Sequence, residues 1–165
     1  MKGGVVWYVS DHATSVHRLL EACGAVSITL AHHTTGRITY LDDREGHEGD
    51  QVEVDERELV QLLRLRLANG GKLAFELWTD PLNDLVCMAS SVASWDAYCF
   101  WFSLDGFTSL EGVDVARRLF RARTRLDDIT VLWLEDRVGM TVGFGPAHLW
   151  AGSHVPGWPV PSVDR

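Results

Sequence analysis

The sequence contains few cysteines and lacks a long apolar run. Its three cysteines, Cys23, Cys87 and Cys99, lie far apart among apolar neighbours, so neither a disulfide framework nor a Cys-x-x-Cys metal site is indicated, and we expect buried, reduced thiols. The longest apolar stretches, such as residues 97–102, are far shorter than the roughly 20 residues of a membrane-spanning helix. Residues 1–9 lack the apolar region and cleavage site of a signal peptide, so we expect a cytoplasmic protein.

The chain also lacks a net positive charge, because its 165 residues carry a formal net charge of -8. Nucleic acid and anionic lipid surfaces both attract cationic proteins, so we expect no membrane association and no direct nucleic-acid binding. A basic protein partner is favoured instead. The length and the 46% of hydrophobic residues are typical of a single folded domain.

Sequence motifs of catalysis are missing as well. No Gly-x-x-x-x-Gly-Lys, His-Glu-x-x-His or Gly-x-Ser-x-Gly pattern occurs, and Gly143-Phe-Gly145 is followed by a proline instead of a helix. Cys87 and Cys99 lie in apolar segments, where a thiol is inert. We therefore expect no cofactor, and the sequence leaves enzymatic activity open while favouring a protein without it.

Histidines are the remaining candidates for chemistry, since the chain has seven. Asp11, His12 and His32 could converge with Asp42 or Asp43 into a metal or acid–base site. His32 and His33 are adjacent, so on a strand they would point to opposite faces and only one could take part. Histidines on a solvated surface are favoured over a metal site, and we expect no bound metal.

Apolar periodicity and turn residues predict helices and strands in the order β-α-β-β-α-β-β-β-α-β-β. Helices are expected over residues 13–23, after an Asp55–Glu58 capping box, and from about Thr108. Residues 26–30 and 37–41 are rich in β-branched residues and predict a hairpin. The fold class is α+β, a two-layer sandwich with a mainly antiparallel sheet and about three helices packed on one face.

One helix–strand–strand module occurs twice in this pattern, over residues 55–92 and 108–145. Each copy is an amphipathic helix followed by a Trp-bearing strand that turns back into a second strand, although the likeness in residues is slight and chance is an alternative. We interpret residues 1–145 as a single α+β domain and residues 146–165 as a tail rich in Pro, Gly and Trp.

Two charged segments stand out. Residues 42–58 carry nine acids against two arginines, with Gly46 and Gly49 expected to loosen the backbone. The last helix has a basic face, which we interpret as solvated or paired with the acidic segment. That face comprises Arg117, Arg118, Arg121, Arg123 and Arg125.

The chain has seven tryptophans, a residue enriched in cores and at binding hot spots. Four lie in expected strands and are assigned to the core: Trp7, Trp78, Trp101 and Trp133. Loop or tail tryptophans are better candidates for a partner surface. The residues expected to contact a partner are Asp42, Asp43, Glu45, Glu48, Asp50, Glu53, Trp95 and Trp150.

These observations leave three functions open. The first is a protein-binding module, because in its compact, acidic, Trp-containing character the chain resembles the immunity proteins of bacterial toxin systems; the resemblance implies an antitoxin-type inhibitor of a cationic protein, possibly a toxin. The second is a small-molecule binder or enzyme with a pocket between sheet and helices, lined by Trp78, Phe100, Trp101 and Trp133. The third is a structural subunit of a larger assembly.

Overall fold

A computed structural model describes residues 4–9, 15–92, 97–123, 131–136 and 148–149. Its elements show the predicted succession of helices and strands, although the predicted strand over residues 26–30 is not among them and residues 51–54, expected to be loop, form a strand. The elements are β1 (Gly4–Val9), α1 (Ser15–Gly24), β2 (Ile38–Leu41), β3 (Gln51–Val54), α2 (Glu56–Ala68), β4 (Lys72–Trp78), β5 (Asp84–Val92), β6 (Ala97–Ser103), α3 (Ser109–Arg123), β7 (Val131–Asp136) and β8 (His148–Leu149).

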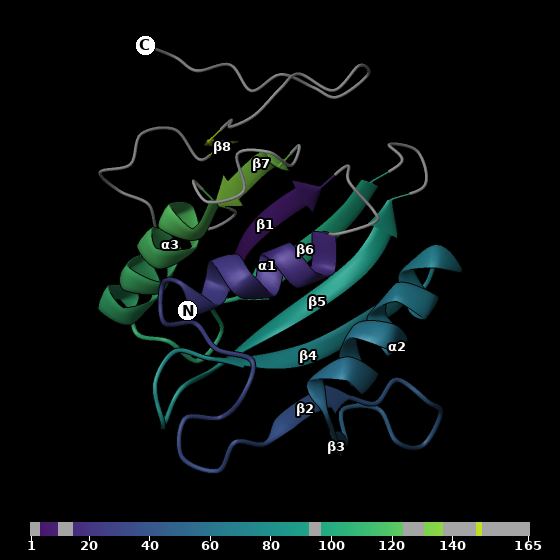
Figure 1. Cartoon of the computed structure of the whole chain (residues 1–165). Coiled ribbons are helices and arrows are strands. Elements are labelled where there is room, and N and C mark those ends of the chain that lie inside the picture. Colours follow the sequence, from purple (N-terminus) through teal and green to yellow (C-terminus); the bar gives the residue numbers. More distant parts are fainter. Residues whose placement is uncertain (1–3, 10–14, 93–96, 124–130, 137–147, 150–165) are drawn as a thin grey trace.

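Within the described residues the strands form one eight-stranded sheet in the order β3-β2-β4-β5-β6-β1-β7-β8, with every neighbouring pair antiparallel. The three described helices form the second layer, in which α1 contacts both α2 and α3 (Figure 1). The α+β two-layer sandwich predicted from the sequence is therefore confirmed.

The core lies between the helices and the sheet. Alternate residues of β4 (Leu73, Phe75 and Leu77) are buried, as the period of 2 in a strand requires. Leu59, Leu63 and Leu67 of α2 are buried at the helical spacing. Each such side chain stabilises the fold by about 1.5–3 kcal/mol. Of the strand tryptophans assigned to the core, Trp7 is fully buried, while Trp78 and Trp101 are partly exposed; the Trp133 side chain lies outside the described residues.

The helix ends follow the predicted capping residues. Asp55 accepts a hydrogen bond from the Glu58 amide at 2.7 Å, and the Glu58 carboxylate accepts one from the Asp55 amide at 3.2 Å, which completes the capping box of α2. Gly70 ends that helix with a φ of 72°. Thr108 and Glu111 form the same reciprocal pair at the start of α3.

The predicted strand over residues 26–30 is wrong. Its amides at Val26 and Ile28 donate to the Cys23 carbonyl and close the end of α1, and only Thr29 forms a bridge, with Trp78. β2 pairs instead with β3 and β4. β-Branched residues are compatible with extended and irregular backbone, so residue type alone cannot name the partner strand.

Two polar contacts link β2 and β3 to the same side chain of β4. The buried Glu76 carboxylate of β4 accepts hydrogen bonds from the Thr39 hydroxyl of β2 and the Gln51 side-chain amide of β3. Glu76 alternates with the core residues of β4, so it belongs to the face of the sheet that points away from the helices. A buried carboxylate requires such partners, so this cluster joins the three strands.

Parts of the prediction fall beyond the described residues. Asp11, His12 and residues 139–144, the expected second strand of the last hairpin, are among them. Of the predicted tail, the structure describes His148 and Leu149, which pair with β7. The division into a domain of residues 1–145 and a tail stays a prediction. The expected repeat of the helix–strand–strand module is not tested, because the second strand of its second copy lies outside the described residues. No helix in the described segments is long and apolar enough to cross a membrane.

Candidate functional site

Residues 42–50 join β2 to β3 at one edge of the sheet and form a closed, hydrogen-bonded loop, which we call the β2–β3 loop. The Asp42 amide donates to the Asp50 carbonyl at 2.9 Å, and the Gly49 amide donates to the Asp42 carbonyl at 2.8 Å. Within the loop, the His47 backbone amide donates to the Arg44 carbonyl and the Asp50 amide donates to the His47 carbonyl, both at 2.9 Å. These bonds extend the β2–β3 pairing into the turn.

Gly46 and Gly49 do not loosen this loop, contrary to the sequence interpretation. Both have positive φ values, 80° and 86°, a region that side chains with a Cβ rarely adopt. The Gly46 amide also donates to the Glu48 carboxylate at 3.0 Å. The glycines therefore permit tight turns, and the acidic segment has a defined shape. Residues 51–54 of the acidic segment, which were expected to be loop, form strand β3.

Asp42 differs most from its predicted place, because it is only 4% exposed. Its carboxylate accepts from the Arg44 backbone amide at 2.9 Å and from Arg44 Nε at 3.0 and 2.7 Å. The hydrogen bonds from the Arg44 side chain lower the pKa of Asp42 to about 2, so the carboxylate is ionised at neutral pH. We conclude that Asp42 shapes the loop from inside and is not presented at the surface as expected.

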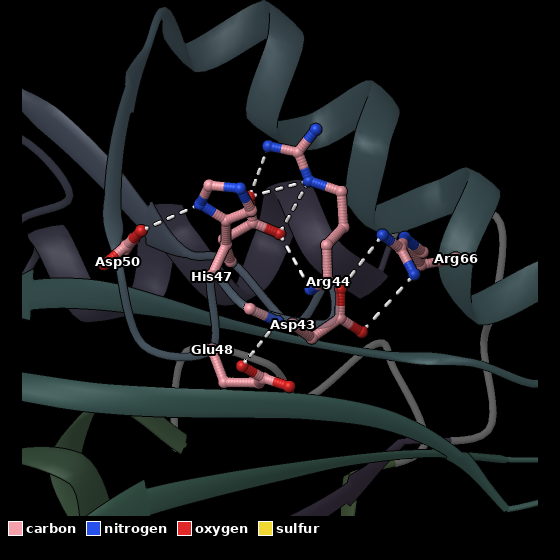
Figure 2. A network of polar contacts seen from close by, with 8 residues as sticks. Asp43, Arg44, His47, Glu48, Asp50 and Arg66 are labelled. Carbon is pink, nitrogen blue, oxygen red and sulfur yellow. Dashed lines mark hydrogen bonds and ion pairs between the residues drawn. The ribbon is translucent and has the colours of Figure 1, made fainter.

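Three further acids of the segment have cationic or histidine partners, two of them in the loop (Figure 2). Asp43 lies 3.1 Å from Arg66 of α2, and Asp50 lies 3.1 Å from His47. Glu53 of β3 lies 2.7 Å from Arg37. The basic face of α3 was interpreted as solvated or paired with the acidic segment, and the helix partner observed for that segment is Arg66 of α2. Figure 1 places α3 on the far side of the molecule from β2 and β3.

Two exposed acids of the loop keep an uncompensated charge. In the part of the chain that the structure describes, no ion pair holds Glu45 or Glu48. Asp50 is also exposed, and its partner His47 is charged only when protonated. Asp50 is therefore a third acid of this surface. The candidate surface is therefore narrower than the predicted set and centres on these three side chains. Trp95 and Trp150, predicted to join it, lie outside the described residues.

The histidine site considered as a possibility stays untested, because Asp11 and His12 lie outside the described residues and only His32 can be placed. His32 Nδ1 accepts from the amides of Thr34 and Thr35, both at 3.1 Å, and its ring meets the edge of Trp78 at a centroid distance of 4.2 Å. His32 is thus committed to its own turn. Within the described segments, no group of three His, Cys, Asp or Glu side chains could hold a metal ion.

The cysteines have different environments. Cys23 and Cys87 are buried, and burial raises the pKa of the Cys23 thiol to about 12 and that of Cys87 well above its ordinary value. Cys99 is half-buried, contrary to the expected burial. The two buried thiols stay protonated at neutral pH and are poor nucleophiles.

Among the surface hollows lined by described residues, two lie away from the pocket expected between sheet and helices. Of the residues named for that pocket, Phe100 is fully buried in the core. One hollow, of about 590 Å³, lies beside α1 and α2 and is lined by His17, Arg57 and Arg64 among others. The second, of about 280 Å³, lies between residues 79–83 and α3. Sequence reasoning missed both, because each brings together segments that are distant in the chain.

Comparison of the chain with protein-family models, with curated proteins and with solved structures finds no match in any of the three.

Proposed function

We propose that this protein is a small binding module that holds a cationic partner protein through its β2–β3 loop, most simply as an inhibitor of the immunity or antitoxin type. The observation that carries the proposal is a hydrogen-bonded loop whose exposed Glu45 and Glu48 have no ion pair in the described part of the chain. The formal net charge of -8 adds a long-range field of the same sign.

A preformed acidic loop suits this role for a physical reason. Fixing the backbone of one residue costs about 1–2 kcal/mol, and the Asp42–Arg44 contact already holds the backbone that carries the acids. Unpaired carboxylates also need no internal ion pair to be broken before they meet a lysine or arginine. Such charges chiefly raise the association rate and set the choice of partner.

The proposed partner is a basic protein, and a bacterial toxin is the class that the resemblance noted in the sequence suggests. The proposal places the encounter in the cytoplasm and assigns the protein no cofactor and no nucleic-acid ligand. The small-molecule binder or enzyme and the structural subunit remain the competing proposals.

The test is capture of partners from the native host on the immobilised full chain at low salt, followed by a high-salt wash and mass spectrometry. We expect one basic protein in stoichiometric amount, released by salt because screening weakens exposed charge pairs. Its affinity for E45Q/E48Q should fall several-fold, mainly through slower association.

The control is E21Q/D84N, which removes the same number of negative charges from exposed positions outside the loop. It should bind with nearly unchanged affinity. Recovery of no basic protein, binding that does not respond to salt, or equal losses in both double variants would overturn the proposal.

A further inference from the structure

A second surface lies at the opposite end of β4 from the β2–β3 loop. β2 runs antiparallel to β4 and its last residue, Leu41, pairs with Ala74 near the start of that strand. Residues 79–83 instead follow the end of β4 and lead into β5, and the start of α3 lies near them (Figure 1). Between them is the hollow of about 280 Å³, which we call the α3 hollow.

The α3 hollow has an apolar floor and an exposed apolar rim. Phe107 and Val115 line it and are 5% and 2% exposed, whereas Leu110, which also lines it, is 86% exposed. Leu82, in the turn that supplies another wall, is 88% exposed. A single exposed leucine is ordinary, but these two are the most exposed large apolar side chains of the described residues, and both belong to the segments that form one hollow.

Carboxylates surround this apolar surface. Asp80, Glu111 and Asp114 line the hollow, against a single cation, Arg118. Hydrogen bonds from the Asn83 side chain lower the pKa of Asp80, and hydrogen bonds from Thr108 lower that of Glu111. Asp80 and Glu111 are therefore ionised at neutral pH, and the acidic residues that line the hollow outnumber its single cation.

The walls of the hollow are held together. Arg118 of α3 lies 3.2 Å from Asp114 on its own helix and donates to the backbone carbonyls of Thr79 and Ser27, each at 3.3 Å. The turn is closed internally by Asp80, which accepts from the Leu82 amide at 2.8 Å and the Asn83 amide at 3.0 Å. The exposed leucines are thus presented by fixed backbone.

We propose that the α3 hollow is a second binding surface, which takes a segment of a partner protein that presents an aliphatic side chain next to a lysine or arginine. The aliphatic group would cover Phe107 and Val115 beside Leu110, and the cation would lie against Asp80 and Glu111. A volume of about 280 Å³ is slightly below the usual size of a site for a whole small molecule, so it suits one or two side chains. The surrounding carboxylates disfavour an anionic ligand.

The probe is a library of random peptides displayed on phage, panned against the full chain, with the enriched peptides then synthesised for titration. We expect a consensus that combines an aliphatic residue with Lys or Arg. Binding of these peptides should fall at least about tenfold in L82S/L110S, as for apolar side chains at an interface centre, and should weaken as salt rises.

The matched control is L65S, which replaces a leucine that is 55% exposed on α2 and should leave binding within about twofold. All variants should melt near the temperature of the unaltered chain, because the replaced side chains are exposed. Should L82S/L110S fail to fold, the single variant L110S serves the same comparison.

No enrichment, a consensus without a basic residue, or equal binding by L82S/L110S and the unaltered chain would overturn the proposal. Peptides whose binding depends on Glu45 and Glu48 but not on Leu82 and Leu110 would assign the site to the β2–β3 loop. This outcome would refute the α3 hollow while supporting the proposed function, so the two proposals fail separately.

Discussion

At the residue scale, the Asp42 carboxylate determines the shape of the β2–β3 loop. Burial of an ionised carboxylate is unfavourable unless hydrogen bonds compensate it, and Arg44 supplies them from both its backbone and its side chain. One acid of a cluster thereby becomes structural, while Glu45 and Glu48 of the same segment remain available to a partner. Acidic residues of the same loop thus have different roles, one structural and the others available for binding.

This arrangement predicts a pH dependence. The pKa of Asp42 is lowered to about 2 in the folded chain, against about 3.9 in an unfolded chain. The stabilisation is therefore fully present above about pH 4 and is lost as the pH falls toward 2. D42N should remove it, so the difference in free energy of unfolding between the two proteins should be constant near neutral pH and shrink below about pH 4.

Urea denaturation of both proteins at several pH values between about 6 and 3 measures this difference. D43N is the matched control, since Asp43 is exposed and paired with Arg66. A difference for D42N that does not change over this range would contradict the assignment of Asp42 as an ionised structural group.

At the scale of elements, the helices were predictable because their signals are local. The capping box of α2 spans four residues, and the glycine that ends the helix directly follows its last turn. Strand pairing was less predictable, because β2 and its neighbour β4 are separated by an intervening strand and helix. Residues 26–30 have strand-like residues and Ile28 is fully buried, yet the burial is achieved without a strand.

The α2 cap gives a prediction at this scale. D55A removes the side chain that accepts the Glu58 amide and should destabilise the protein by about 1 kcal/mol. The free energy of unfolding measured by denaturant checks it. D55N, which keeps a capping oxygen, should recover most of the loss, and equal losses in the two variants would show that charge rather than capping matters.

At the scale of the whole molecule, the helices and the sheet share one core. Leu63 of α2 is fully buried and belongs to the same buried cluster as Phe75 of β4 and Phe100 of β6. The two acidic surfaces lie at opposite ends of β4, and their exposed side chains lie outside this core, whereas Phe107 and Val115 in the floor of the α3 hollow belong to it. Substitution of the exposed side chains of either surface should therefore alter binding without changing the free energy of unfolding.

Cooperative unfolding through this core can be tested with L63A. Loss of a buried leucine side chain should cost about 2–5 kcal/mol, because it leaves a cavity in a close-packed interior. Thermal unfolding followed by far-UV circular dichroism and by tryptophan fluorescence should give one coincident transition at a lower temperature. L65A, on the exposed side of α2, is the control and should shift the transition little.

The sequence by itself determined the α+β class, the three described helices, the caps of α2 and α3 and the buried face of α2, because capping, turns and periodicity act between residues a few positions apart. Only the tertiary structure decided that β2 lies between β3 and β4, that Asp42 is buried, and that the turn bearing Leu82 meets the start of α3. These outcomes depend on contacts between segments far apart in the chain. Many different sequence patterns satisfy such contacts equally well.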